Sequence, residues 1–455
     1  WKHGRTDVEG FTGHLGPEEE APPNEWESFF GGPAWAYDEE VGKWYLHLFD
    51  EKQPDLNWEN PDVRDEIFEM MEWWLDKGID GFRMDVINLL SKPDSVTKHD
   101  PPTNTSPMWD SIDGPRMQEF LEEMYDRVLA GQDVFALGEM IGQGMSMDIA
   151  QEYVEADGPL STLFHFDHVL LDHGGKIWER DDWDLNDLRD VLNRWQYGLA
   201  EKGWNSIYLS NHDQPRLVSR FGNDGEYREE SAKLLATLIF TLRGTPYIYQ
   251  GAEIGMTNYP FDSLDEFRDV ETINPVQNAL DNGEIESFES VKHALRQNSR
   301  DNARTPMQWS DEEHAGFTTG EPWIGVNPNH DEINVEAARE DPDSIWHYYR
   351  DLIDLRKEHD VMIYGHYDVL LNDHEEVWAY TRTLGDERLL VTLNLAEWDG
   401  HFWIDENEVD FDPQNVEAEL LIGNYGADET ATEVDPAAFD LRPWEARVYR
   451  LTERD

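Results

Sequence analysis

The stretch that decides the fold is Gly81-Phe82-Arg83-Met84-Asp85-Val86. Before it, in residues 61–77, apolar side chains recur at helical spacing. The composition of residues 81–86 predicts a short buried strand. Arg83 and Asp85 are two residues apart, so alternation along a strand points both side chains to the same face. Burying an unpaired charge costs several kcal/mol. The pair therefore indicates either a structural ion pair or a functional site at the end of a strand.

Two later stretches repeat this pattern of an apolar strand that ends in an acid. Residues 133–139 end in Leu137-Gly138-Glu139, and residues 206–213 end in Asn211-His212-Asp213. Segments of helical length separate the three, and further strand-like segments occur at 164–168 and 245–251. Strands that alternate with helices in this way predict an α/β barrel whose C-terminal face gathers the carboxylates.

These three regions resemble, in the same order, three signature regions of glycoside hydrolase family 13, the α-amylase family. The resemblance implies a (β/α)8 TIM barrel, of which this chain would contain the fourth to the eighth strand. A closed barrel needs eight strands, and the early Asp-x-x-x-Asn-His region of the family is not in the sequence. We therefore expect that an N-terminal part of about 100 residues or more, with any metal site of its loops, lies outside this chain.

Three domains are expected on this basis. Residues 1–58 would be the remainder of an irregular domain inserted after the third barrel strand, and residues 59–360 would form the barrel, with an irregular insertion at 261–325. Period-two patterns at 377–383, 388–395 and 446–451 predict that residues 361–455 form a C-terminal antiparallel β-sandwich.

The resemblance also implies roles for the carboxylates. Retaining cleavage of a glycosidic bond needs two carboxyl groups about 5–5.5 Å apart. Asp85 matches the family's nucleophile, Glu139 its general acid/base, and Asp213 the third carboxylate, which binds sugar hydroxyls. Arg83 is expected to keep Asp85 ionised, because a nearby cation lowers a carboxyl pKa. Glu139, close to two acids, is expected to have a raised pKa and to hold the proton that it donates.

Arg83 and three further residues are implied as substrate-binding. His212, beside Asp213, is either a structural histidine or a ligand of sugar hydroxyls, and its motif favours the second role. Arg300 matches the family arginine that closes the pocket, whereas its neighbour Arg304 is either a second site residue or structural. Val86 resembles the residue found after the nucleophile in enzymes that cut α-1,6 links; relatives that prefer α-1,4 links tend to carry Ala or Thr there. Residues 53–57, Gln-Pro-Asp-Leu-Asn, resemble a signature of the same enzymes and fit an ordinary loop equally well.

Charge is the strongest compositional signal. The chain has 98 Asp and Glu against 36 Lys and Arg, a formal net charge of −62. Such a charge repels nucleic acid and anionic membranes and destabilises a compact state at low salt. Because molar salt shortens the Debye length to about 3 Å, the composition predicts a halophilic protein. A nucleic-acid mimic is the alternative, but 19 Trp, 19 Phe and 17 Tyr favour a large core and a carbohydrate site.

Other classes find no support in the sequence. There is no Cys, no HExxH motif, no P-loop and no Cys/His cluster, so we expect neither a cofactor nor a metal site. The longest apolar run, residues 234–242, is too short to span a bilayer, and no signal-like segment precedes it. The expected partner is a short oligosaccharide and the expected location is cytoplasmic, while the oligomeric state stays open.

The main functional expectation is a retaining, exo-acting α-glucosidase of the oligo-1,6-glucosidase type. A transglycosylase or sucrose isomerase of the same family shares the carboxylates and differs in what attacks the glycosyl-enzyme. A non-catalytic relative, such as the ectodomain of an amino-acid transporter heavy chain, lacks a complete carboxylate set, whereas Asp85, Glu139 and Asp213 are all present here.

Overall fold

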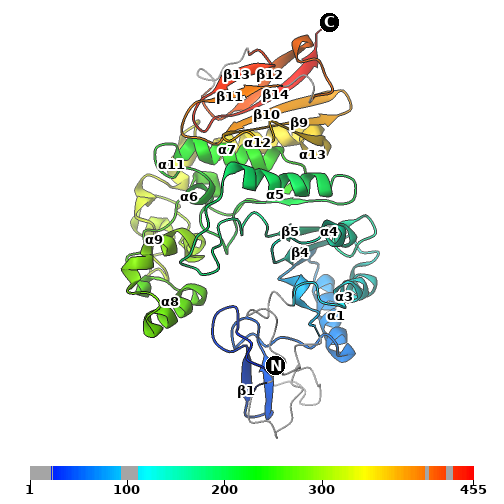
Figure 1. Ribbon diagram of the computed structural model, residues 1–455, viewed down its shortest axis with the longest axis vertical. Coiled ribbons are helices and arrows are strands. Elements are labelled where there is room, and N and C mark those ends of the chain that lie inside the picture. The colour runs from blue at the N-terminus through cyan, green and yellow to red at the C-terminus, as the bar shows by residue number, and fades with distance from the viewer. Residues whose placement is uncertain (1–21, 23, 94–110, 405–408, 427–433, 455) are drawn as a thin grey trace. The chain divides into compact units, whose positions relative to one another are not determined.

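The computed structural model describes residues 22, 24–93, 111–404, 409–426 and 434–454 (Figure 1). The chain forms two compact units: residues 1–167 with 201–204, and residues 168–200 with 205–455. These two units are defined by contacts within each of them and do not test the three domains expected from the sequence, which stay a prediction. In the part of the chain that the structure describes, no helix is long and apolar enough to cross a membrane.

The first unit begins with an antiparallel hairpin. Its strands β1 (Trp35–Asp38) and β2 (Lys43–Leu46) pair with Trp35 opposite Leu46. Aromatic and aliphatic side chains, among them Trp26 and Leu89, form a small core around the hairpin. Residues 53–57 follow, and the buried Asp55 lies 2.8 Å from the ammonium group of Lys92. The ion pair therefore anchors this segment to the loop that follows strand β3 (Gly81–Met84).

Three parallel strands form the sheet of the first unit, in the order β3-β4-β5. Gly81 begins β3 and pairs with Phe135. A side chain at this position would place its Cβ 2.0 Å from the Phe135 carbonyl oxygen, so only glycine fits. The strands are β3 (Gly81–Met84), β4 (Phe135–Met140) and β5 (Thr162–His165), and the helices are α1 (Pro61–Asp76), α3 (Met117–Met124), the π-helical turn η3 (Tyr125–Leu129) and α4 (Met147–Val154).

Burial differs from the sequence expectation at two places in this unit. The strand β3 is only half-buried, because among the described residues it pairs with β4 alone and forms an edge of the sheet. In α1, Met70 and Trp74 are exposed, although their spacing predicted a buried stripe. The buried face is instead rotated toward Arg64, which lies over the Phe120 ring and pairs with Glu123. An arginine can cover apolar surface with its aliphatic stem, so a hydrophobicity pattern does not reveal this face.

Helices and a sheet face share the main core of the second unit. The helices α5 (Leu185–Gly198), α7 (Arg228–Thr241) and α12 (Ile345–Glu358) lie on one side of the C-terminal sheet (Figure 1). Their side chains pack with residues of the sheet, including Trp378 and Tyr380. The strands β6 (Ser206–Ile207) and β7 (Thr245–Pro246) pair in parallel. The strand predicted at 206–213 is thus paired over two residues only, although Tyr208 and Leu209 remain buried.

The insertion at 261–325 contains two helices of more than ten residues, so the expectation of an irregular segment is wrong there. These are α8 (Val270–Asn282) and α9 (Phe288–Asn298). They close over a hydrophobic cluster in which the rings of Phe261 and Phe267 stack with centroids 4.0 Å apart. Side chains at helical spacing, such as Val291 and Leu295, supply the rest of this cluster. The remaining helices of the unit are α6 (Leu217–Phe221), α10 (Asp301–Arg304), α11 (Val335–Glu340) and α13 (Asp360–Tyr364).

The C-terminal residues form two antiparallel sheets, which confirms the predicted β-sandwich. A five-stranded sheet has the order β12-β14-β10-β9-β8, and a two-stranded sheet pairs β11 with β13. Side chains from both sheets, such as Leu390 and Phe402, meet in one buried cluster. The strands are β8 (His366–Leu370), β9 (Val377–Leu384), β10 (Glu387–Asn394), β11 (Gly400–Trp403), β12 (Val416–Gly423), β13 (Ala438–Leu441) and β14 (Ala446–Glu453).

Candidate active site

The structure brings the predicted site residues together in two groups, one in each unit. In the first unit, Arg83 at the end of β3 contacts two carboxylates. One of its Nη atoms pairs with Asp85, and the other lies 2.6 Å from Oε1 of Glu139 in β4. The Asp85 side chain is 71% exposed and that of Glu139 only 6%. The arginine was expected beside Asp85, and its contact with Glu139 is a second role that the sequence did not predict.

Val86 contributes its backbone to this group. The residue has φ 38° and ψ 43°, in the left-handed region that a β-branched side chain rarely adopts. In this conformation its N–H donates to Oε2 of Glu139 at 3.0 Å. The neighbouring Asn88 is buried and exchanges two hydrogen bonds with the backbone of Ile141, just beyond β4. The turn after β3 is thus held against the end of β4, although such strain costs about 1–3 kcal/mol.

Burial raises the pKa of Glu139 to about 7. The nearby Arg83 guanidinium and the Val86 N–H oppose this shift, whereas a hydrogen bond with Asp85 and the charge of that group add to it. The sequence predicted the direction but attributed it to neighbouring acids. Loss of hydration is the larger cause, since a carboxylate in a low-dielectric site favours its neutral form. A carboxyl group with this pKa holds a proton near neutral pH and is able to donate it.

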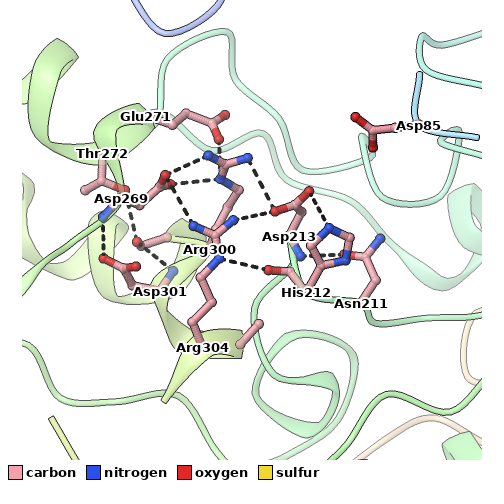
Figure 2. Close-up of polar contacts among 12 residues, drawn as sticks. Asp85, Asn211, His212, Asp213, Asp269, Glu271, Thr272, Arg300, Asp301 and Arg304 are labelled. Carbon is pink, nitrogen blue, oxygen red and sulfur yellow. Dashed lines mark hydrogen bonds and ion pairs between the residues drawn. The ribbon is translucent and has the colours of Figure 1, made fainter. Parts of the chain in front are cut away.

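The second unit holds the other predicted residues around Asp213 (Figure 2). The Asp213 backbone N–H donates to the Asn211 side chain at 2.8 Å, which fixes the turn after β6. Nε2 of His212 lies 3.2 Å from Oδ2 of Asp213. Two arginines contact the other oxygen, Oδ1: Nη1 of Arg300 at 3.4 Å and Nη2 of Arg304 at 2.5 Å. Arg304, whose role the sequence left open, is thus the closer of the two to Asp213.

Two acids that the sequence did not single out complete this group. Asp269 occupies the N-cap position of α8, where its side chain makes no capping hydrogen bond, and Glu271 lies in the first turn of the helix. Asp269 binds Arg300 through both carboxyl oxygens, at 2.8 Å to Nε and 2.6 Å to Nη2 (Figure 2). Glu271 Oε2 lies 2.6 Å from the same Nε but outside hydrogen-bonding geometry, because the single Nε proton points to Asp269. The signal available in the sequence was a pair of acids before a helical pattern, which is also the ordinary signature of a helix N-terminus.

Burial also raises the pKa of Glu271 to about 7. The Arg300 and Arg304 guanidiniums lower it, while the charges of Asp269 and Asp213 raise it further. The guanidiniums of Arg300 and Arg304 already balance the charges of the other two carboxylates, so an ionised Glu271 would be a third, uncompensated negative charge in a buried site. Among the described residues, no group of three or more acids and histidines has the arrangement that holds a metal ion.

Comparison with known proteins identifies the family. The sequence profile described as "Alpha amylase, catalytic domain" matches residues 7–365. The chain belongs to the alpha-amylase family. Its resemblance to glycoside hydrolase family 13, and with it the barrel class and the expectation of a glycoside hydrolase, is thereby confirmed.

Relatives within the alpha-amylase family act on several glucosides. An oligo-1,6-glucosidase from Parageobacillus thermoglucosidasius is 50% identical over 434 residues, which cover 94% of this chain and 75% of that protein. The crystal structure of trehalose-6-phosphate hydrolase from Bacillus licheniformis matches with TM-score 0.84 and 43% identity, over 95% of this chain and 76% of that one. The crystal structure of isomaltulose synthase from Erwinia rhapontici NX5 matches with TM-score 0.88 and 37% identity, over 97% of this chain and 77% of that one.

Proposed function

We propose that this glycoside hydrolase is a retaining, exo-acting α-glucosidase that cleaves α-1,6 links at the non-reducing end of short oligosaccharides. The observation that carries the proposal is the Arg83-linked pair of carboxyl groups, of which Glu139 is buried with a pKa of about 7 and Asp85 is exposed. A proton donor beside an ionised carboxylate is the arrangement that retaining cleavage requires.

In the proposed reaction, Asp85 attacks the anomeric carbon while Glu139 donates its proton to the leaving oxygen, so the glycosidic bond breaks and a glycosyl ester forms. Glu139, now ionised, takes a proton from water, whose oxygen attacks the same carbon and releases Asp85. Retaining enzymes place the two carboxyl groups about 5–5.5 Å apart, and this separation of Asp85 and Glu139 stays a prediction. Because the Asp85 side chain is 71% exposed, it has room to turn toward a sugar.

Asp213, with His212, Arg300 and Arg304, is assigned to binding the hydroxyls of the terminal glucose. This assignment and the convergence of both groups in one pocket stay predictions. The preference for α-1,6 links rests on Val86 and on the similarity to oligo-1,6-glucosidases. An isomaltulose synthase is also similar to the chain, so isomerisation of sucrose is the second candidate.

Product analysis in molar KCl tests the proposal. With isomaltose, maltose, sucrose and trehalose 6-phosphate as substrates, we expect the highest kcat/KM for isomaltose. An aryl α-glucoside, whose leaving group is not a sugar, should release α-glucose as the first anomer seen by NMR. β-Glucose as the first product would refute a retaining mechanism. An isomeric disaccharide formed from sucrose in excess over free glucose would instead favour the isomerase.

A salt requirement is part of the proposal, together with a cytoplasmic location. The structure supports it because several cations are used in the interior. Arg356 and Arg382 are buried and donate to backbone carbonyls, for example Nη1 of Arg356 to Met362 at 2.8 Å and Nη2 of Arg382 to Gly365 at 2.8 Å. Such arginines do not balance surface carboxylates, whose repulsion must then be screened by salt.

A further inference from the structure

We propose that Asp269 is a positioning residue that holds Arg300 and Arg304 against Asp213. The inference rests on the proposed function, since it concerns how the third carboxylate is presented to the sugar. Asp269 has no place in the sequence motifs of the site. Its side chain is only 3% exposed, and it contacts both arginines that contact Asp213.

The contacts form a closed ring of alternating charges. Oδ1 of Asp269 lies 2.6 Å from Nη2 of Arg300 and 3.4 Å from Nη1 of Arg304. Oδ1 of Asp213 lies 3.4 Å from Nη1 of Arg300 and 2.5 Å from Nη2 of Arg304. Each guanidinium therefore bridges the two carboxylates. Because Asp269 occupies the Nε–Nη2 edge of Arg300 with two parallel bonds, the Nη1 end is the part left to face Asp213.

The backbone on both sides of Arg300 is fixed to the start of α8. Oδ2 of Asp301 accepts hydrogen bonds from the N–H groups of Arg268 at 2.6 Å and Asp269 at 3.0 Å. On the other side of Arg300, the hydroxyl of Ser299 lies 2.9 Å from that of Thr272 (Figure 2). The helix N-terminus thus presents Asp269 in a set orientation, and the bidentate contact passes that orientation to the arginine.

Without the carboxylate of Asp269, the arginine has another buried partner. Glu271 Oε2 is 2.6 Å from Nε of Arg300 and has no hydrogen bond. An asparagine at 269 accepts through one oxygen only, so the Nε proton becomes available to Glu271. Rotation of Arg300 toward Glu271 would withdraw Nη1 from Asp213. The Asp213 side chain is 28% exposed. It would then lose one of the two positive charges that stabilise its carboxylate and part of the contact that fixes its orientation.

The experiment compares an aryl α-glucoside with its 2-deoxy analogue in wild-type enzyme and in Asp269→Asn. Hydrogen bonds to the sugar 2-hydroxyl strengthen in the transition state. We assign the 2-hydroxyl to Asp213, so the 2-deoxy analogue cannot use this contact. We therefore expect kcat/KM to fall about 100-fold on the glucoside and less than about tenfold on the 2-deoxy analogue. The ratio of the two losses does not depend on the folded fraction. Asp269→Glu, which keeps the charge, should recover part of the lost selectivity.

The matched control is Asp281→Asn, which replaces an exposed acid of the same helix that accepts a hydrogen bond from Gln277 at 3.0 Å. This substitution removes the same charge and should leave kcat/KM unchanged on both substrates. Equal losses on the two substrates in Asp269→Asn would show a merely structural role and overturn the inference. Wild-type enzyme that does not hydrolyse the aryl glucoside would refute the proposed function itself, an outcome that is distinct from equal losses.

Discussion

Replacement of Glu139 by glutamine should stabilise the protein at neutral pH while impairing hydrolysis of natural substrates. The carboxyl group has its pKa raised from 4.5 to about 7 by burial, and its side chain is only 6% exposed. Below pH 4.5 the group is protonated in both the folded and the unfolded state. As the pH rises from 4.5 to 7, the unfolded state releases the proton first, and the wild-type fold loses stability.

The size of this loss follows from the two pKa values. At 1.36 kcal/mol for each pH unit, it reaches about 3 kcal/mol above pH 7. Glutamine does not titrate and retains an acceptor for the Val86 N–H. The variant should therefore match the wild type near pH 4.5 and exceed its unfolding free energy by about 3 kcal/mol at pH 8.

Denaturant unfolding followed by circular dichroism in molar KCl, at several pH values between 5 and 8, measures this difference. Glu122→Gln is the matched control, because Glu122 is exposed on α3 and the substitution should change stability by no more than about 0.5 kcal/mol. A Glu139→Gln difference that stays constant from pH 5 to pH 8 would refute the reasoning. Activity gives an independent check: the variant should lose hydrolysis of isomaltose but retain much of it on nitrophenyl glucosides, whose leaving group needs little protonation.

Four further predictions follow from other parts of the molecule. Asp85→Asn should lower hydrolysis about 10⁴-fold with an unchanged circular dichroism spectrum; residual activity near the wild-type level would exclude Asp85 as the nucleophile. Val86→Thr should shift the kcat/KM ratio from isomaltose toward maltose by about tenfold, the scale of one pocket contact, and an unchanged ratio would contradict its role. Arg382→Met should cost about 3 kcal/mol or more in denaturant unfolding, because it removes both donors from the buried carbonyl of Gly365; Arg450→Met, which removes an exposed ion pair, should cost less than about 1 kcal/mol. Finally, circular dichroism should show loss of structure below a few tenths molar KCl at pH 7 and partial recovery near pH 5, and a chain that stays folded in salt-free buffer would exclude the halophilic interpretation.

Local sequence patterns determined the elements that carry the chemistry. Glycine at 81, an alternating Arg83 and Asp85, and an apolar strand ending at Glu139 are readable without coordinates, because strand periodicity and the cost of burying charge act over a few residues. The same holds for the period-two strands of the C-terminal sheets, which the structure places close to their predicted bounds.

Only the tertiary structure decided which side chains are buried and which charges meet. Met70 and Trp74 share a spacing with buried residues and are exposed, while Arg64 is buried by its contacts with a ring and an acid from another helix. Asp269 likewise resembles an ordinary helix cap until α8 is placed beside Arg300. Such contacts join residues about thirty or more positions apart, and hydration, which sets the pKa of Glu139, depends on what surrounds a group in space rather than on its neighbours in the chain.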